Sequence, residues 1–489
     1  MELKVTPYRH QKEAADFALR HYAAGSRGVA FFMEVGTGKT LPAVMTACRL
    51  HEEGKVRRLL VVCPLAVFRA WAEAFELTDT PKTVTEYRPG REGQIFCPHP
   101  GLDVILINYE SAWRRAGQIS AWAPEMVICD ESQKIKSPQS AQSKYLHKLG
   151  DRTRYKMILT GTPVGNSPLD FWSQYRFLDP AVFGGSYYAF RAAYAVVRTE
   201  TQWSTGRKYP VIVGYRNEDR LIEKAHRLAV RVRKEDCLDL PEQTDEYRCV
   251  TLEPEARKIY DGLRKDAVAE LFEGHVTASN ILTRLMRLSQ VCGGYIGADE
   301  EECPARQIRQ ISRAKLEALC DIAEEVLAQG RKLVVFARFT PEIDGILAML
   351  SERFPASGAV RMTGETPAAE RGEIIRRFQT DPDCRVFVGN AQCAGAGITL
   401  TAADVMVFYS LSYSYLDYEQ ARARIHRIGQ RNRCTYLHLL VSDSVDALVL
   451  EAVQNKHDLA RLFVDRERSG PSETVRSRSE KKDQKGETA

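Results

Sequence analysis

Short apolar segments rich in β-branched residues alternate with longer stretches of helical periodicity, and this alternation occurs twice along the chain. The first series comprises segments 29–33, 59–64, 104–109, 126–131 and 157–162, and the second comprises 333–337, 360–364, 385–390, 405–410 and 436–441. Strands joined by helical crossovers form parallel sheets with helices on both faces. The sequence therefore predicts an α/β fold with two doubly wound parallel-sheet lobes, and it excludes a β-sandwich.

The segment between the two series has a different character. Residues 166–310 carry charged and aromatic patterns of helical periodicity, such as ARKIYDGLRKDAVAELF at 256–272, which favour a helical insertion. From Arg466 onward the chain is polar and almost without apolar residues, so it cannot offset the entropy of ordering. The predicted division is an N-terminal lobe at 1–165, the helical insertion at 166–310, a C-terminal lobe at 311–465 and a disordered tail at 466–489.

Composition narrows the class of protein. The 489 residues are 44% hydrophobic and 27% charged, which suits folded domains and excludes a small binding module, a collagen-like chain or a disordered one. The 12 cysteines are scattered without a CxxC pair, which argues against a zinc ribbon and for a reducing compartment. The sequence has no signal-peptide core and no run long enough to span a membrane, so we expect a cytoplasmic protein of a bacterium or a phage-infected host, without membrane contact.

The segment MEVGTGKT at 33–40 stands between a predicted strand and a predicted helix, which is the context that a phosphate-binding loop requires. Gly36 and Gly38 allow backbone N–H groups to turn toward a polyphosphate. Lys39 supplies a charge for the β- and γ-phosphates, and Thr40 offers a hydroxyl to Mg²⁺. Met33 replaces the first glycine of the strict pattern, so the triplet GKT alone leaves a chance turn as the alternative.

Asp130 and Glu131 directly follow the apolar run MVIC. At the carboxyl end of a strand near the loop, one carboxylate reaches Mg²⁺ and the second reaches the attacking water. Paired acids are common on protein surfaces, but four apolar residues immediately before them favour the end of a buried strand. Together the loop and the two acids predict hydrolysis of a nucleoside triphosphate.

The second series carries QARARIHRIGQ at 420–430, in which Arg424 and Arg427 are three residues apart. On a helix this spacing places both side chains on one face. From there, guanidinium groups could neutralise charge at the transferring phosphoryl group across a cleft. The alternative is an amphipathic basic helix that faces solvent, and the phosphate loop in the other lobe argues against it.

The order of these motifs resembles the two-lobed helicase-like ATPases of helicase superfamily two, and within it the Swi/Snf family of duplex-DNA translocases, which have two RecA-like lobes. The resemblance covers roughly residues 5–460. The similar segments are YRHQ (8–11), VVCPLAVFRAW (61–71), INYES (107–111), DESQ (130–133), LTGTPVGN (159–166), RKEDCLDLP (233–241), SRAKLEAL (312–319), KLVVFARF (332–339), QCAGAGITLTAAD (392–404) and QARARIHRIGQ (420–430). The ending RIHRIGQ is close to the signature that separates this family from DEAD-box RNA helicases.

The resemblance implies a compact motor of bacterial or phage type that uses ATP and Mg²⁺ and tracks along double-stranded DNA. The residue roles it implies are adenine recognition by Gln11, phosphate binding by Gly36, Thr37, Gly38 and Lys39, Mg²⁺ binding by Thr40 and Asp130, activation of water by Glu131, and nucleotide contacts from the second lobe by Gly397, Arg424 and Arg427. The family reads DEGH or DEAH where Ser132 and Gln133 follow Glu131 here. This departure leaves the coupling of hydrolysis to the other lobe open.

The partner and the product remain open on sequence grounds. The net charge is only +5, so DNA must be held by basic groups concentrated between the lobes. A strand-separating DNA helicase is one alternative, which a wedge hairpin in the second lobe would distinguish. An ATP-gated DNA-binding switch is another, and the presence of Lys39, Glu131 and the two arginines argues against it. Protein partners and the direction of movement are not determined.

Overall fold

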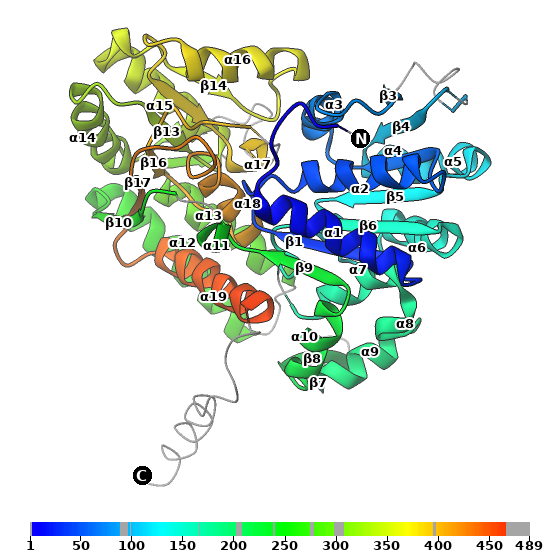
Figure 1. The fold of residues 1–489 in the computed structure, drawn as a ribbon. Coiled ribbons are helices and arrows are strands. Elements are labelled where there is room, and N and C mark those ends of the chain that lie inside the picture. Colours follow the sequence, from blue (N-terminus) through cyan, green and yellow to red (C-terminus); the bar gives the residue numbers. More distant parts are fainter. Residues whose placement is uncertain are drawn as a thin grey trace.

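Two parallel sheets organise the computed structural model (Figure 1). The structure describes residues 2–88, 96–97, 99–165, 167–201, 208–237, 240–273, 278–297, 308–394 and 398–465. In the first sheet the spatial order of the strands is β3 (Lys82–Glu86), β4 (Leu102–Ile107), β2 (Arg58–Val62), β5 (Met126–Asp130), β6 (Tyr155–Thr160), β1 (Gly28–Met33) and β9 (Ala229–Val232). In the second sheet the order is β10 (Gln243–Val250), β17 (Cys434–Val441), β16 (Val405–Phe408), β13 (Leu333–Phe336), β15 (Val386–Gly389) and β14 (Val360–Met362).

Every neighbouring pair of strands in both sheets is parallel. Each of the ten strands predicted from apolar runs is present. The prediction of two parallel-sheet lobes is therefore confirmed.

Both faces of the first sheet are buried, because side chains alternate along each strand. In β1, Val29 and Phe31 pack with helices α1 (Arg9–Ala23), α2 (Thr40–Glu52) and α3 (Phe68–Glu76). Ala30 and Phe32 point to the opposite face, which is covered by α4 (Tyr109–Arg114), α5 (Ala116–Trp122), α6 (Ala141–Arg152) and α7 (Asp170–Leu178). Burial on both sides explains why these strands appear in the sequence as continuous apolar runs.

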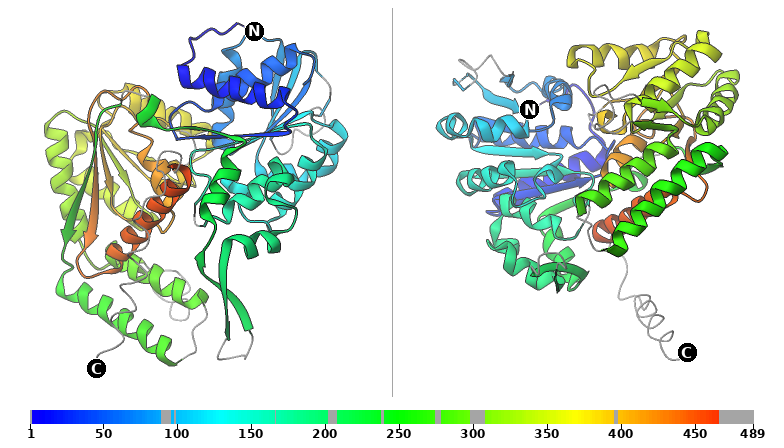
Figure 2. Two further views of the ribbon diagram at one scale, coloured as in Figure 1. Left: turned by 60° about the horizontal axis from the view of Figure 1, so that its bottom comes forward. Right: turned by 180° about the vertical axis from the view of Figure 1, so that it is seen from behind.

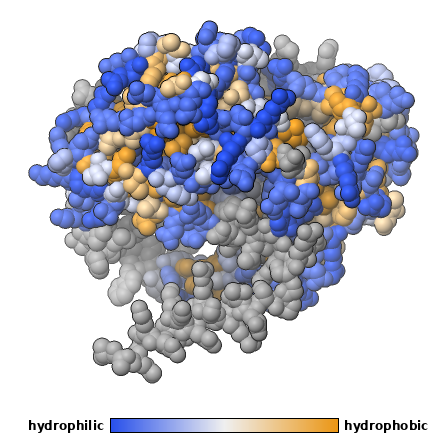
Figure 3. Space-filling view, turned by 60° about the vertical axis from the view of Figure 1, so that its left-hand side comes forward, coloured by the Kyte–Doolittle hydropathy of each residue, from blue (hydrophilic) through white to orange (hydrophobic). Residues whose placement is uncertain are grey.

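The second sheet is also covered on both faces. Helices α14 (Ala314–Ala328) and α15 (Thr340–Arg353) pack on the side of Leu333 and Val335. Helices α16 (Ala368–Thr380) and α18 (Tyr415–Arg422) lie on the side of Val334 and Phe336. Figure 3 shows that the outer face of this lobe is mostly hydrophilic. In the described parts of the chain, no helix is long and apolar enough to cross a membrane.

The segment 166–310 differs from the predicted helical insertion, because strands occur there as well as helices. Its helices are α7, α8 (Pro180–Phe183), α9 (Tyr187–Tyr194), α10 (Glu218–His226), α11 (Lys234–Cys237), α12 (Pro254–Glu273) and α13 (Ala278–Cys292). Its strands are β7 (Ala195–Thr201), β8 (Lys208–Tyr215), β9, β10, β11 (Tyr295–Gly297) and β12 (Ile308–Gln310).

Two of these strands belong to the lobes themselves, since β9 is an edge of the first sheet and β10 is an edge of the second. Strand β10 is largely exposed and carries charged residues, as edge strands commonly do, so no apolar run marked it in the sequence. The chain thus passes from one sheet to the other between Val232 and Gln243. Figure 2 shows the β7–β8 hairpin and the helices α12 and α13 projecting on the same side of the molecule. The predicted tail at 466–489 lies outside the described residues.

A buried histidine in α6 predicts a pH-dependent stability. Burial lowers the pKa of His147 to about 4, and its Nε2–H donates to the carbonyl of Ser173 at 2.9 Å. The unfolded chain binds this proton near pH 6.5 and the folded chain only near pH 4, so stability falls as the pH drops between these values, by up to about 3 kcal/mol. We expect His147→Asn to flatten the dependence of the urea midpoint on pH in this window. If the urea midpoint of His147→Asn depended on pH as steeply as that of the wild type, His147 would not be the source of this pH dependence.

Candidate active site

The loop after β1 is a tight turn that only glycine permits at two positions. Gly36 and Gly38 have φ angles of +98° and +77°, in the left-handed region that side chains disfavour. A Cβ atom on Gly36 would lie 3.1 Å from the Cβ of Arg427, which belongs to the second lobe. Thr37 is fully buried, and its hydroxyl donates to the carbonyl of Glu34 at 2.8 Å. The Thr37 side chain therefore stabilises the loop from within.

The predicted lysine and the two predicted carboxylates converge. The Nζ of Lys39 lies 2.5 Å from Oε1 of Glu131 and 3.4 Å from Oδ1 of Asp130. All three side chains are nearly buried. Lys39 ends the loop after β1, and Asp130 ends β5. The geometry follows from the parallel sheet, because the carboxyl ends of its strands share one edge.

Burial and mutual charge act against each other in this cluster. Burial alone would lower the pKa of Lys39, but the charges of Glu131 and Asp130 outweigh burial and raise the pKa. Burial raises the pKa of Asp130, and the Lys39 charge only partly opposes this shift. The pKa of Glu131 is lowered despite burial, because Lys39 attracts its charge and Lys39 and Gln133 donate hydrogen bonds to it. Glu131 is thus held as a carboxylate, the form that accepts a proton from water.

Gln133 stands where the family resemblance predicts a histidine, and it has two hydrogen-bond partners in the same lobe. Its Nε2 donates to Oε2 of Glu131 at 2.6 Å, and its Oε1 accepts from the hydroxyl of Thr160 at 2.8 Å. Thr160 ends β6 in the motif LTGTPVGN. The amide therefore connects Glu131 to the neighbouring strand of the same lobe.

Two aromatic residues without a predicted role, Trp71 and Tyr109, hold Asp130. The indole Nε1 of Trp71 donates to Oδ2 of Asp130 at 3.0 Å. The hydroxyl of Tyr109 donates to the backbone carbonyl of Asp130 at 2.7 Å. Both aromatic residues lie in segments quoted for the family resemblance. Their presence there was a usable signal, but nothing in the sequence indicated which group each would contact.

The second lobe contributes its two arginines from a turn. Helix α18 ends at Arg422, so the prediction that Arg424 and Arg427 share a helix face is wrong. The backbone tightens at this point, because the N–H of Arg424 donates to the carbonyl of Ala421, three residues back. The two guanidinium groups nevertheless converge, since each donates to the carbonyl of Ile398, at 3.4 Å and 3.2 Å respectively.

Of the two arginines, Arg424 lies in the less favourable electrostatic environment. It is almost fully buried, and its Nε has no hydrogen-bond partner. Burial, reinforced by repulsion from Arg427 and opposed by attraction to Glu131, lowers its pKa to about 9. Burial also lowers the pKa of Arg427. An anion placed between these arginines and the loop would relieve both costs.

Direct contacts join the lobes at this site. Nε2 of Gln420 in α18 donates to Oε2 of Glu131 at 3.2 Å. Nζ of Lys234, just past β9, donates to the carbonyl of His426 at 3.0 Å. A cavity of about 550 Å³ adjoins these contacts and is lined from both lobes, by Glu34 and Thr162 on one side and Arg422 on the other. The second lobe therefore contacts Glu131 directly.

Gln11 and Gly397 complete the predicted set. Nε2 of Gln11 donates to the carbonyl of Gly38 at 3.2 Å, and its Oε1 accepts from the N–H of Tyr8 at 3.0 Å. The structure thus places Gln11 against the loop, and its role with adenine stays a prediction. Gly397 lies outside the described residues.

The donor set suits Mg²⁺ and a polyphosphate. Mg²⁺ prefers oxygen ligands from one or two carboxylates together with substrate phosphates, and Thr40 and Asp130 offer a hydroxyl and a carboxylate at the start of α2 and the end of β5. The Lys39 ammonium is a cation already balanced by both acids, which indicates that the site accommodates positive charge. Bound Mg²⁺ would supply neutralisation of phosphate charge there.

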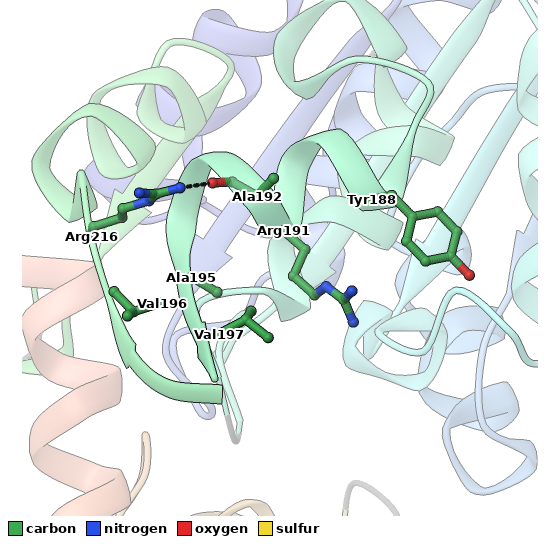
Figure 4. Close-up of a pocket in the computed structure, with 7 residues that line it drawn as sticks. All are labelled: Tyr188, Arg191, Ala192, Ala195, Val196, Val197 and Arg216. Atoms are coloured by element: carbon green, nitrogen blue, oxygen red, sulfur yellow. Dashed lines mark hydrogen bonds between the residues drawn. The ribbon is translucent and has the colours of Figure 1, made fainter. Parts of the chain in front are cut away.

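A different cavity, of about 380 Å³, lies at the base of the β7–β8 hairpin (Figure 4). Its lining includes Tyr188, Arg191, Val196, Val197 and Arg216, and a guanidinium N–H of Arg216 donates to the carbonyl of Ala192. None of the residues predicted for nucleotide binding or hydrolysis lines it. This cavity is therefore separate from the cluster of Lys39, Asp130 and Glu131.

The loop with Lys39, the paired carboxylates and the arginines from a second parallel-sheet lobe agree with a two-lobed, helicase-like ATP hydrolase. Family models agree with this class: the SNF2-related domain matches residues 10–294, and the helicase conserved C-terminal domain matches residues 314–429. The chain belongs to the SNF2-related family of helicase-like ATPases. The resemblance and the ATP-hydrolase prediction are thereby confirmed.

Several known proteins are similar to this chain. The DNA annealing helicase and endonuclease ZRANB3 of Mus musculus is 28% identical, over 93% of this chain and 40% of that protein. The ATP-dependent helicase MG018 of Mycoplasma genitalium is 24% identical, over 93% of this chain and 42% of that protein. The solved SWI2/SNF2 ATPase core of Sulfolobus solfataricus in complex with dsDNA is 23% identical with a TM-score of 0.45, covering 94% of this chain and 93% of that one. The chain spans less than half the length of these two curated relatives.

Proposed function

We propose that the protein is an ATP- and Mg²⁺-dependent translocase on double-stranded DNA. The observation that carries this proposal is the hydrogen bond from Gln420 of the second lobe to Glu131 of the first. A base that is contacted by the other lobe makes hydrolysis sensitive to lobe position, which is what a motor requires. The SNF2-related family assignment and the DNA-acting name of a relative support DNA as the partner.

In this proposal each lobe has a chemical task. The loop and Lys39 bind the phosphates, Thr40 and Asp130 hold Mg²⁺, and Gln11 adjoins the adenine side of the loop. Glu131 accepts the proton of the attacking water, and Arg424 with Arg427 neutralises charge at the γ-phosphate. Closure of the lobes brings these groups together, and opening after hydrolysis releases them. Repeated closure while both lobes grip DNA produces movement.

We also propose the cytoplasm as the compartment in which the protein works. Ten cysteines whose side chains the structure describes are free thiols. Several of them, such as Cys63 and Cys129, are buried in the first sheet. A reducing compartment keeps such thiols unpaired.

The test of the partner is ATPase activity with no nucleic acid, single-stranded DNA, duplex DNA and RNA in parallel. We expect duplex DNA to raise kcat more than single-stranded DNA or RNA does. Phosphate contacts dominate such a grip, so stimulation should fall with added salt and show little sequence preference. The Lys39→Ala variant is the negative control for ATPase activity, because it lacks the charge that binds the phosphates.

Movement is tested separately. The motor should displace the third strand of a triplex while it leaves a forked duplex paired. Stimulation by single strands alone together with efficient fork unwinding would instead identify a strand-separating helicase. Tight ATP-dependent DNA binding without turnover would identify a switch.

A further inference from the structure

Arg422, the last residue of α18, is bound by side chains from three segments of the second lobe. Nη1 and Nη2 of its guanidinium donate to Oδ1 and Oδ2 of Asp245 in β10, the second bond at 3.0 Å. Nη1 also donates to the hydroxyl of Tyr418 at 2.8 Å. The guanidinium carbon lies 3.9 Å from the ring centroid of Tyr436 in β17. A bidentate carboxylate and a stacked ring together fix the guanidinium in one orientation.

Arg422 also fixes the start of residues 423–427, called here the arginine turn, which carry Arg424 and Arg427. The carbonyl of Arg422 accepts from the hydroxyl of Tyr436 at 3.0 Å and from the N–H of His426 at 3.4 Å. Both the guanidinium and the carbonyl of Arg422 are therefore bound to the rest of the lobe. Nε of Arg424, by contrast, has no hydrogen-bond partner. The direction of the Arg424 side chain thus depends on how the arginine turn is anchored.

The chain segment that joins the two sheets contacts the same turn. Nζ of Lys234 donates to the carbonyl of His426 at 3.0 Å, and Nε2–H of His426 donates to the carbonyl of Pro241 at 2.8 Å. Asp245 follows in β10 and binds Arg422 at the start of the turn. Residues in and just after the joining segment therefore bind the arginine turn and the residue before it.

The charge of Arg422 is already balanced, in contrast to that of Arg424. Burial would lower the pKa of Arg422, but its hydrogen bonds to Asp245 and the charge of Asp245 outweigh burial and raise the pKa. For Arg424, burial lowers the pKa to about 9. An arginine that is paired with a carboxylate has its donors and its charge engaged. Arg422 therefore suits the role of an anchor, and Arg424 suits direct contact with an anion.

We propose that Arg422 is a positioning residue, bound by Asp245, that directs Arg424 and Arg427 toward the transferring phosphoryl group. This inference rests on the proposed role of those two arginines in ATP hydrolysis. A displacement of about 1 Å in a group that contacts the reacting atoms can reduce a rate by about 10²-fold. Loss of the anchor therefore slows hydrolysis although Arg422 itself binds no phosphate.

The first experiment measures binding without turnover. It compares the affinity for ADP alone with the affinity for ADP and aluminium fluoride, which together imitate the transferring phosphoryl group. For Arg422→Gln we expect the affinity for the aluminium fluoride complex to fall by up to about 10²-fold, because only the transferring group faces the two arginines. The affinity for ADP should equal that of the wild type, which also shows that the variant is folded. An unchanged affinity for the complex, or an equal fall in both affinities, would overturn the proposal.

A second pair of variants tests the anchor without changing α18 or the arginine turn. Asp245→Asn keeps the shape of the side chain and removes its charge, so kcat for ATP hydrolysis should fall while KM for ATP stays the same. Asp245→Glu restores the carboxylate and should recover most of the lost rate. Hydrolysis at the wild-type rate by Asp245→Asn would exclude the ion pair as the anchor.

The matched control is Arg433→Gln. Arg433 precedes β17, and its Nη2 lies 3.7 Å from Oε2 of Glu242, at the end of the segment that joins the sheets. This variant therefore also removes an ion pair between an arginine and an acid near the start of β10, but outside the arginine turn. It should leave kcat and both affinities unchanged. A loss equal to that of Arg422→Gln would show that any ion pair in this region has the same effect, and it would contradict a specific role of Arg422.

A double-mutant cycle separates the positioning role from the proposed role of the two arginines. Arg422→Gln should lower the single-turnover rate much less in the Arg424→Ala background than in the wild type, because a group that it positions is absent. Additive effects would overturn the positioning role. If Arg424→Ala and Arg427→Ala slow hydrolysis but Arg422→Gln does not, the positioning role alone fails. If Arg424→Ala and Arg427→Ala hydrolyse ATP normally, the proposed role of the two arginines fails, and the positioning role fails with it.

Discussion

Replacing Glu131 with Gln should lower kcat for ATP hydrolysis by about 10² to 10⁴, the usual contribution of a general base. The amide retains the shape of the side chain but does not accept a proton from the attacking water. ATP affinity should stay the same or increase, because Glu131 no longer holds the Lys39 ammonium at 2.5 Å. The checks are single-turnover hydrolysis and equilibrium binding of ATP.

A matched control for this experiment is Glu110→Gln. Glu110 is an exposed carboxylate in the same lobe, paired with Arg114 one helical turn away, and it has no contact with the site. Its removal should leave hydrolysis unchanged. Turnover at the wild-type rate in Glu131→Gln would exclude Glu131 as the general base. Loss of ATP binding in this variant would instead show that Glu131 contributes to the affinity for ATP.

Replacing Arg424 with Ala should reduce kcat by about 10³ to 10⁵, the range found for arginines that stabilise a transferring phosphoryl group. Its guanidinium is buried and attracted by Glu131, and its Nε has no hydrogen-bond partner. The affinity for ATP should change far less, since the loop holds the phosphates. Pre-steady-state kinetics with duplex DNA present measure both quantities.

Arg424→Lys tests the geometry of the group, because it keeps a charge but removes the planar fork of donors. We expect it to recover only a small part of the lost rate. Arg433→Ala is the control, since Arg433 lies 63% exposed on the same lobe and contacts Thr244. Normal ATP hydrolysis by both variants, Arg424→Ala and Arg427→Ala, would show that the segment 424–427 is only a basic surface and takes no part in hydrolysis.

The parts of the structure that follow from chain periodicity were predictable. Buried parallel strands such as β1 and β5 are apolar throughout, so they stand out in the sequence. Their carboxyl ends lie along one edge, so the strand pattern alone predicts that Lys39 and Asp130 lie close together. Strands without apolar runs, such as β3 with the sequence KTVTE, could not be found in this way.

Side-chain partners were not predictable, because they depend on orientation across distant segments. Trp71 and Asp130 are 59 residues apart, and Gln420 and Glu131 are 289 apart. The spacing of Arg424 and Arg427 indicated one helix face, but the helix ends two residues before Arg424. Their convergence comes from the shared carbonyl of Ile398, which no periodicity encodes.

The passage of the chain between Val232 and Gln243 has a mechanical consequence. It joins the β9 edge of one sheet to the β10 edge of the other, whereas β14 is the far edge of the second sheet. Six strands spaced about 4.8 Å apart place β14 about 24 Å from β10. A rotation of about 10° at the linker would then displace that far edge by about 4 Å. A small rotation at this linker would therefore move β14, and α16 that packs beside it, much further than it moves β10.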